Sequence, residues 1–144
     1  MGAAMGGGGG GVGRGPMTNR RRVLLVDDEE GIRRGLARSL GRYHEIHTAS
    51  DGHQGIVAVE RDGPFVAVVA DLQMPGMDGL AMLREVARIA PRTPRILFTG
   101  TLDASRLVDA AVDLELFRVI YKPASTADLL AALAAAALEY DRPR

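Results

Sequence analysis

The chain has 144 residues, a length that suits one domain with a single hydrophobic core. Its 18 basic residues balance its 18 acidic residues, so bulk charge indicates no polyanion-binding surface, and we expect no direct contact with nucleic acid. The lack of cysteine excludes a disulfide framework, a thiolate metal site and a cysteine nucleophile. It suits a reducing compartment, and we expect a cytoplasmic protein.

The N-terminal segment is rich in glycine, which accounts for nine of the first sixteen residues. It lacks the basic and apolar regions of a signal peptide, and it cannot bury enough surface to offset its chain entropy. We therefore predict a disordered tail over residues 1–20 and one folded domain over residues 21–144. The alternative is that translation starts at Met17. No apolar run approaches the roughly twenty residues that a membrane span needs, so we expect no membrane partner.

From residue 22 onward, short apolar runs alternate with helical patterns, which is typical of a parallel sheet wrapped by helices. The run 23–26 is continuous and aliphatic, which predicts a central strand covered on both faces. The next segment repeats apolar residues at helical spacing and predicts an amphipathic helix: Ile32, Leu36 and Leu40. Residues 43–48 are more polar and predict an edge strand. Asp51 then offers an N-cap for a weaker helix.

The second half of the chain continues the same alternation. Strands are predicted at 65–70, 96–98 and 119–121, with helices after Asp78, over 103–112, and after Ser125 or Thr126. The last helix is predicted to bury four leucines: Leu129, Leu130, Leu133 and Leu138. The five cycles predict an α/β fold of the flavodoxin-like type, a (βα)5 three-layer sandwich whose five-stranded parallel sheet has the order 2-1-3-4-5.

Residues that carry chemistry follow the predicted strands, where ligands bind in open parallel sheets. Asp27 and Asp28 end the first strand, Asp71 the third, Thr99 the fourth and Lys122 the fifth. Three carboxylates in one crevice repel one another unless a cation lies among them. Mg²⁺ is the economical choice, because it takes hard oxygen ligands and keeps waters that a phosphoryl oxygen can replace. The pattern therefore indicates phosphoryl transfer to an aspartate.

Lys122 is also the only lysine, since the other 17 basic residues are arginine. The compact ammonium suits a point contact with a phosphoryl oxygen better than the larger arginine fork does.

Taken alone, paired aspartates and a Pro-Gly loop are common turn residues. If these residues only formed turns, their common position at one edge of the sheet would be a coincidence.

Four segments, 26–29, 70–79, 98–100 and 121–123, together resemble the receiver domain of two-component response regulators, a resemblance that extends from Arg22 to about Tyr140. It implies that Asp71 is phosphorylated. It also implies that Mg²⁺ is bound by four groups: Asp27, Asp28, Asp71 and the backbone carbonyl of Gln73. Thr99 and Lys122 would bind the phosphoryl oxygens, and Gly100 would leave the acyl phosphate accessible.

The resemblance also implies partners. The phosphoryl donor would be a sensor histidine kinase or a histidine phosphotransfer protein, and the output a downstream effector protein, with a phosphorylation-dependent homodimer as a further form. Such a domain is a switch that catalyses only its own phosphorylation and dephosphorylation. Receivers commonly carry Tyr or Phe three residues before this lysine, but Val119 occupies the position here, so the face of the fourth helix, fifth strand and fifth helix would signal differently.

Two other functions fit parts of the sequence. A pseudo-receiver that binds a protein partner constitutively is suggested by Val119 and by the lack of an output domain. A flavin-binding or hydrolytic enzyme is disfavoured because the loop after the first strand is acidic instead of a Gly/Ser/Thr phosphate cradle.

Overall fold

The structure is a computed structural model that describes residues 20–100 and 104–143. The predicted N-terminal tail lies outside the described residues except for Arg20, and its disorder stays a prediction. In the described part of the chain, no helix has the length and apolar character needed to cross a membrane.

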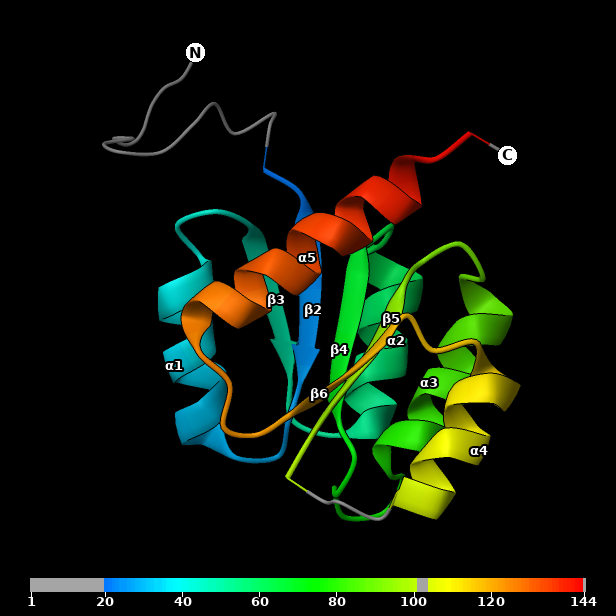
Figure 1. Cartoon of the computed structure of the whole chain (residues 1–144). Helices are drawn as coiled ribbons and strands as arrows, with labels where there is room; N and C mark the ends of the chain where they lie inside the picture. Colours follow the sequence, from blue (N-terminus) through cyan, green and yellow to red (C-terminus); the bar gives the residue numbers. More distant parts are fainter. Residues whose placement is uncertain (1–19, 101–103, 144) are drawn as a thin grey trace.

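The strands form one parallel sheet (Figure 1). They are β2 (Arg22–Val26), β3 (Glu45–Ala49), β4 (Ala67–Asp71), β5 (Arg95–Thr99) and β6 (Arg118–Tyr121). Their spatial order is β3-β2-β4-β5-β6, which confirms the predicted order 2-1-3-4-5. The run 23–26 is central and residues 45–49 form an edge, both as predicted.

Helices cover both faces of the sheet. They are α1 (Glu30–Leu40), α2 (Gly52–Asp62), α3 (Gly79–Ile89), α4 (Ala104–Leu114) and α5 (Thr126–Asp141). Helices α1 and α5 pack on one face, and α2, α3 and α4 pack on the other (Figure 1). This arrangement confirms the predicted three-layer sandwich.

Strand alternation divides the core between the two faces. In β2, Val23 and Leu25 pack toward α1 and α5, whereas Leu24 and Val26 pack toward α2 and α3. All four side chains are nearly or fully buried, as expected for a central parallel strand covered on both sides. The buried, hydrogen-bonded sheet therefore holds the residues at the carboxyl ends of its strands in fixed positions.

The helix starts follow the predicted capping residues. The side chains of Asp51, Asp78 and Ser125 accept hydrogen bonds from backbone amides in the first turns of α2, α3 and α5. One expectation for α5 is wrong: Leu138 is 73% exposed, although Leu129 and Leu133 are buried. Leu138 lies five residues after Leu133, which places it about 140° around the helix, away from the core.

Candidate functional site

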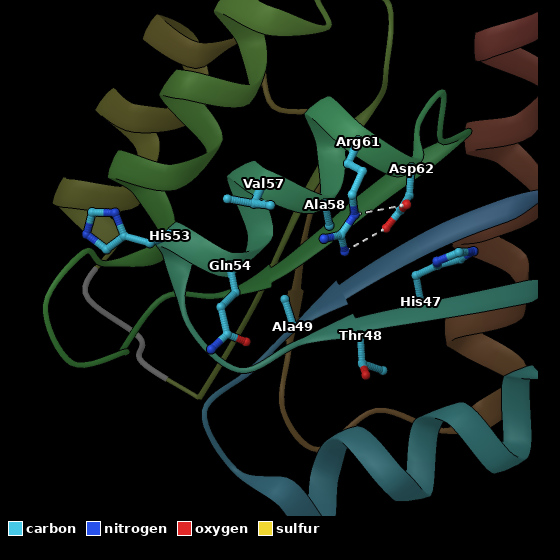
Figure 2. A pocket seen from close by; sticks show the side chains of 9 residues that line it. All are labelled: His47, Thr48, Ala49, His53, Gln54, Val57, Ala58, Arg61 and Asp62. Carbon is cyan, nitrogen blue, oxygen red and sulfur yellow. Dashed lines mark hydrogen bonds and ion pairs between the residues drawn. The ribbon is translucent and has the colours of Figure 1, made fainter.

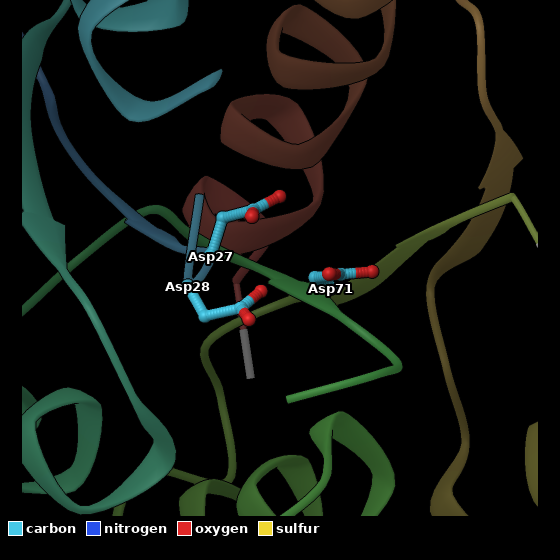
Figure 3. A group of neighbouring side chains, drawn as sticks. All are labelled: Asp27, Asp28 and Asp71. Carbon is cyan, nitrogen blue, oxygen red and sulfur yellow. The ribbon is translucent and has the colours of Figure 1, made fainter. Parts of the chain in front are cut away.

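The predicted site residues meet at the carboxyl edge of the sheet. Asp27 and Asp28 follow β2, Asp71 ends β4, Thr99 ends β5 and Lys122 follows β6. Figure 3 shows the three aspartates grouped at this edge, and one oxygen of each lies within 4.8 Å of the others. Because β2 and β4 are neighbours, the strand order itself brings these carboxylates together.

Two of the three carboxylates are buried. Asp27 is 4% exposed and Asp71 is 8% exposed, whereas Asp28 is exposed. A buried carboxylate needs a cation or hydrogen-bond donors to offset its lost hydration. The exposed Asp28 leaves the cluster open to solvent on one side, so an ion can enter.

Lys122 supplies a positive charge inside this cluster. Its Nζ lies 3.0 Å from Asp27 Oδ2 and 3.5 Å from Asp71 Oδ1, and it also lies 5.1 Å from the centre of the Phe98 ring. The backbone amide of Lys122 donates to the carbonyl of Thr99 at 2.8 Å, which ties the end of β6 to the end of β5. The only lysine of the chain therefore points at the acids.

Burial and neighbouring charge change the proton affinity of these groups. Burial is the largest cause that raises the pKa of Asp71, and the Asp27 charge adds to it, while Lys122 and a hydrogen bond from the Gln73 backbone partly offset the rise. Burial alone would lower the pKa of Lys122, but its bond to Asp27 and the charges of Asp27 and Asp71 raise it overall. The site thus favours the charged form of Lys122 and disfavours the charged form of Asp71.

The loop after Asp71 depends on a close approach between two backbone segments. Gly79 N donates to Leu72 O at 2.9 Å, and a Cβ at Gly79 would lie 2.1 Å from the Asp71 carbonyl oxygen. Only glycine allows α3 to begin this close to the Asp71 peptide. Gly76 has φ +78° in the same loop, a conformation that side chains disfavour.

Thr99, Gly100 and Gln73 lie at or just after the carboxyl ends of β5 and β4. Thr99 is 1% exposed and pairs in register with Tyr121 of β6. Gly100 is exposed, and a Cβ there would meet nothing within 4 Å, so local packing does not require glycine. Gln73 is exposed and lies two residues after Asp71.

The acid cluster fits a magnesium ion by its donor chemistry. Three carboxylates offer hard oxygen ligands close together, and solvent can reach Asp28. Among residues 20–100 and 104–143, this is the only cluster of three or more His, Asp or Glu side chains arranged to hold a metal ion. The histidines take no part in it: His47 bonds Glu45 at 2.7 Å on the edge strand, and His53 lies exposed on α2.

A second hollow lies between β3 and α2, separate from the acids (Figure 2). Its lining includes His47, His53 and an ion pair between Arg61 and Asp62 at 3.3 Å. Figure 2 shows His47 and His53 at opposite ends of the hollow. It therefore contains no converging set of ligands.

One contact was not predicted from the sequence. Arg33 of α1 donates from Nη1 to the backbone carbonyl of Asp27 at 2.7 Å. The sequence shows Arg33 only as a polar residue on an amphipathic helix, six positions after Asp27. Helical spacing relates positions within α1, whereas this bond connects α1 to the end of β2, so periodicity gives no signal for it.

Known proteins share both the sequence pattern and the fold. Response regulator MprA of Mycobacterium leprae is 33% identical over 115 residues, which are 79% of this chain and 50% of that protein. Regulatory protein AtoC of Escherichia coli is 36% identical over 95 residues, which are 65% of this chain and 20% of that protein. The chain thus spans between a fifth and a half of the length of these two relatives.

A solved structure is similar to this chain in both fold and sequence. The signal receiver domain of an HD domain-containing protein from Pseudomonas fluorescens superimposes with a TM-score of 0.78 at 30% identity, covering 84% of this chain and 97% of that one. The sequence profile of the response regulator receiver domain matches residues 23–134, which include every strand-end residue described above. The chain therefore belongs to the response regulator receiver domain family, whose members are signalling switches of phosphorelays.

Proposed function

We propose that the chain is a phosphoacceptor switch in which Asp71 receives a phosphoryl group from a phosphohistidine. The donor would be a sensor histidine kinase or a histidine phosphotransfer protein. The observation that carries the proposal is the convergence of three carboxylates on the only lysine, whose Nζ lies 3.0 Å from Asp27 and 3.5 Å from Asp71.

The proposed reaction is a transfer between two nucleophiles. An Asp71 carboxylate oxygen attacks the phosphorus, an O–P bond forms, and the N–P bond breaks with its electron pair returning to the imidazole nitrogen of the donor. Mg²⁺ would be held by Asp27, Asp28, Asp71 and the Gln73 backbone carbonyl, and it supplies charge neutralisation for the phosphoryl oxygens. The protein contributes mainly positioning and fixed charge.

Lys122 and Thr99 have separate roles in this proposal. Phosphorylation converts the Asp71 carboxylate into an acyl phosphate and places its negative charge on the phosphoryl oxygens, so the Lys122 ammonium, now shared between Asp27 and Asp71, becomes available to one of those oxygens. The Thr99 hydroxyl would donate to a second phosphoryl oxygen. Gly100, where a Cβ would meet open space, would leave room for the water that hydrolyses the acyl phosphate.

The output would use the face formed by α4, β6 and α5. These elements expose apolar side chains, among them Val108 and Val112 on α4 and Tyr121 on β6. Val119 packs into the core beneath α4, where receivers commonly place an aromatic ring. Tyr121 is 43% exposed and pairs in register with Thr99, so we propose that movement at Thr99 is transmitted through this neighbour to an effector protein.

A phosphorylation-dependent homodimer would use the same apolar face. The domain would act in the cytoplasm, a reducing compartment that the lack of cysteine suits.

The test uses beryllofluoride, which mimics a phosphoryl group on aspartate. With Mg²⁺ present, it should bind and shift the amide resonances of Asp71 and Thr99, and then those of the α4–β6–α5 face. Asp71→Asn should abolish these shifts, while Asp109→Asn, an exposed aspartate on α4, should keep them. Partner binding that is unchanged by Asp71→Asn would instead support a constitutive binding module.

A further inference from the structure

The carbonyl of Asp27 lies just beyond the paired part of β2. The last paired residue is Val26, opposite Ala49 on one side and Ala70 on the other. The Asp27 amide still donates to Ala49 O at 3.2 Å, but its carbonyl instead accepts from Arg33 Nη1 at 2.7 Å. A helix side chain thus satisfies the first backbone acceptor after the strand.

Every polar group of Asp27 is held in place. Its Oδ1 accepts from the Glu29 amide at 2.9 Å, and its Oδ2 accepts from Lys122 Nζ at 3.0 Å. With the Arg33 bond, the peptide between Asp27 and Asp28 is fixed from the carbonyl side as well. This peptide joins two of the three clustered carboxylates.

Asp28 depends on that peptide more than Asp27 does. Its side chain is exposed, and no hydrogen bond or ion pair within the described residues holds its carboxylate. The direction in which Asp28 points therefore follows from the orientation of its backbone. Arg33 holds the carbonyl that precedes Asp28 at 2.7 Å.

We propose that Arg33 is a positioning residue of the metal site, and that its bond to the Asp27 carbonyl places Asp28 for Mg²⁺ binding. The inference rests on the proposed function, because it assumes that the acid cluster binds Mg²⁺. Arg33 itself would not touch the ion. It would act like the residues that hydrogen-bond and orient the ligands in other metal sites. Loss of such a residue weakens metal affinity by about 10- to 100-fold.

The charge and the hydrogen bond of Arg33 have opposite consequences. A guanidinium near three carboxylates repels a divalent cation, so removing the charge alone should strengthen Mg²⁺ binding slightly, by about two- to threefold, since solvent screens the charge. Removing the bond should weaken Mg²⁺ binding because Asp28 loses its orientation. The sign of the change therefore identifies which effect dominates.

Arg34 provides a matched control. It is the next residue on α1, it carries the same charge, and its guanidinium pairs with Glu30, 3.4 Å away on the helix surface. Arg34→Met therefore removes one positive charge from the same helix without touching the Asp27 carbonyl. Arg33→Lys keeps the charge and one donor but loses the planar guanidinium.

The experiment is a Mg²⁺ titration of the unphosphorylated full chain, followed by the amide resonances of Asp27, Asp28 and Asp71. We expect Arg33→Met to raise the Kd about tenfold, Arg34→Met to leave it within about threefold, and Arg33→Lys to fall between wild type and Arg33→Met. Amide spectra without Mg²⁺ establish that each variant is folded. If Arg33→Met does not fold, Arg33→Gln gives the same comparison.

The possible outcomes separate the two hypotheses. Equal or tighter Mg²⁺ binding by Arg33→Met than by Arg34→Met, with wild type binding normally, overturns the role of Arg33 and leaves the proposed function intact. Failure of wild type to bind Mg²⁺ overturns the proposed function, and the role of Arg33 with it.

Discussion

At the scale of single residues, the site is a balance between buried carboxylates and one ammonium. Asp71 has a raised pKa because it is buried beside Asp27, and Lys122 only partly offsets this. The folded state therefore holds a proton on Asp71 more tightly than the unfolded chain does. Its contribution to stability is greatest below the ordinary pKa of 3.8 and is lost as pH rises through the raised folded value.

Lys122→Met should raise the pKa of Asp71 further, because it removes the cation that favours the charged carboxylate. An NMR titration of the Asp71 carboxyl carbon without Mg²⁺ measures this shift. Arg118→Met, which removes an exposed charge on β6, is the control and should leave the titration unchanged. An unchanged or lower Asp71 pKa in Lys122→Met would contradict the electrostatic description of the site.

A second prediction at the residue scale concerns the packing of Gly79. Gly79→Ala should lower the free energy of unfolding by about 1–3 kcal/mol, because the new Cβ would overlap the Asp71 carbonyl. Gly31→Ala is the matched control: a Cβ there meets nothing within 4 Å, and alanine in helix α1 should stabilise by about 0.5–1 kcal/mol. Urea denaturation measures both, and equal effects of the two substitutions would contradict the packing argument.

At the scale of secondary-structure elements, β5 contains a buried charge that anchors α4. Arg95 is 7% exposed, and it donates to Thr93 O at 3.0 Å and to Leu114 O at 3.1 Å. Leu114 ends α4, and Glu115 follows with φ 50°, so the guanidinium satisfies a carbonyl at the C-terminus of the helix. Burial lowers the pKa of Arg95, with partial compensation from the Glu115 charge.

Arg95→Met should destabilise the protein by about 2–3 kcal/mol, since it leaves several carbonyls without their charged donor. Amide hydrogen exchange should show the loss most clearly at the end of α4. Arg84→Met, on the exposed face of α3, should change the unfolding free energy by less than about 0.5 kcal/mol. A loss below that value in Arg95→Met would show that the buried guanidinium does not anchor α4.

The elements show what the sequence could predict and where it stops. Within the described residues, the strands and helices lie near their predicted positions, because buried parallel strands are short continuous apolar runs whereas amphipathic helices repeat apolar residues at helical spacing. The leucines of α5 were not all placed correctly, since its alanine-rich sequence defines no sharp apolar face and Leu138 points to solvent. The sequence gives no signal that Arg95 is buried, because its bond to the end of α4 is made to Leu114 O, 19 residues away.

At the scale of the whole molecule, strand order made the site predictable. Asp27 and Asp71 are far apart in sequence, but the order 2-1-3-4-5 places their strands side by side. The bond of Arg33 to the Asp27 carbonyl was not predictable, because it depends on the side-chain conformation of Arg33 and not on topology. Topology thus predicts which residues meet, whereas the details of their orientation require coordinates.

Mg²⁺ should stabilise the whole domain, because an ion that binds only the folded state raises the free energy of unfolding. At a concentration 100 times its Kd, the gain is about 2.7 kcal/mol. The rise should disappear with EDTA and in Asp27→Asn, and it should shrink as pH falls because the ligands must be deprotonated. Thermal unfolding with and without Mg²⁺ measures it, and an equal rise in Asp27→Asn would place the ion elsewhere.

The central claim is that Asp71 accepts a phosphoryl group with the help of Mg²⁺, and intact-mass measurement after incubation with acetyl phosphate tests it most directly. The account predicts one added phosphoryl group in wild type and in Asp109→Asn, and none in Asp71→Asn or in wild type with EDTA. Phosphoryl incorporation that persists in Asp71→Asn, or its absence from folded wild type with Mg²⁺, would contradict the account.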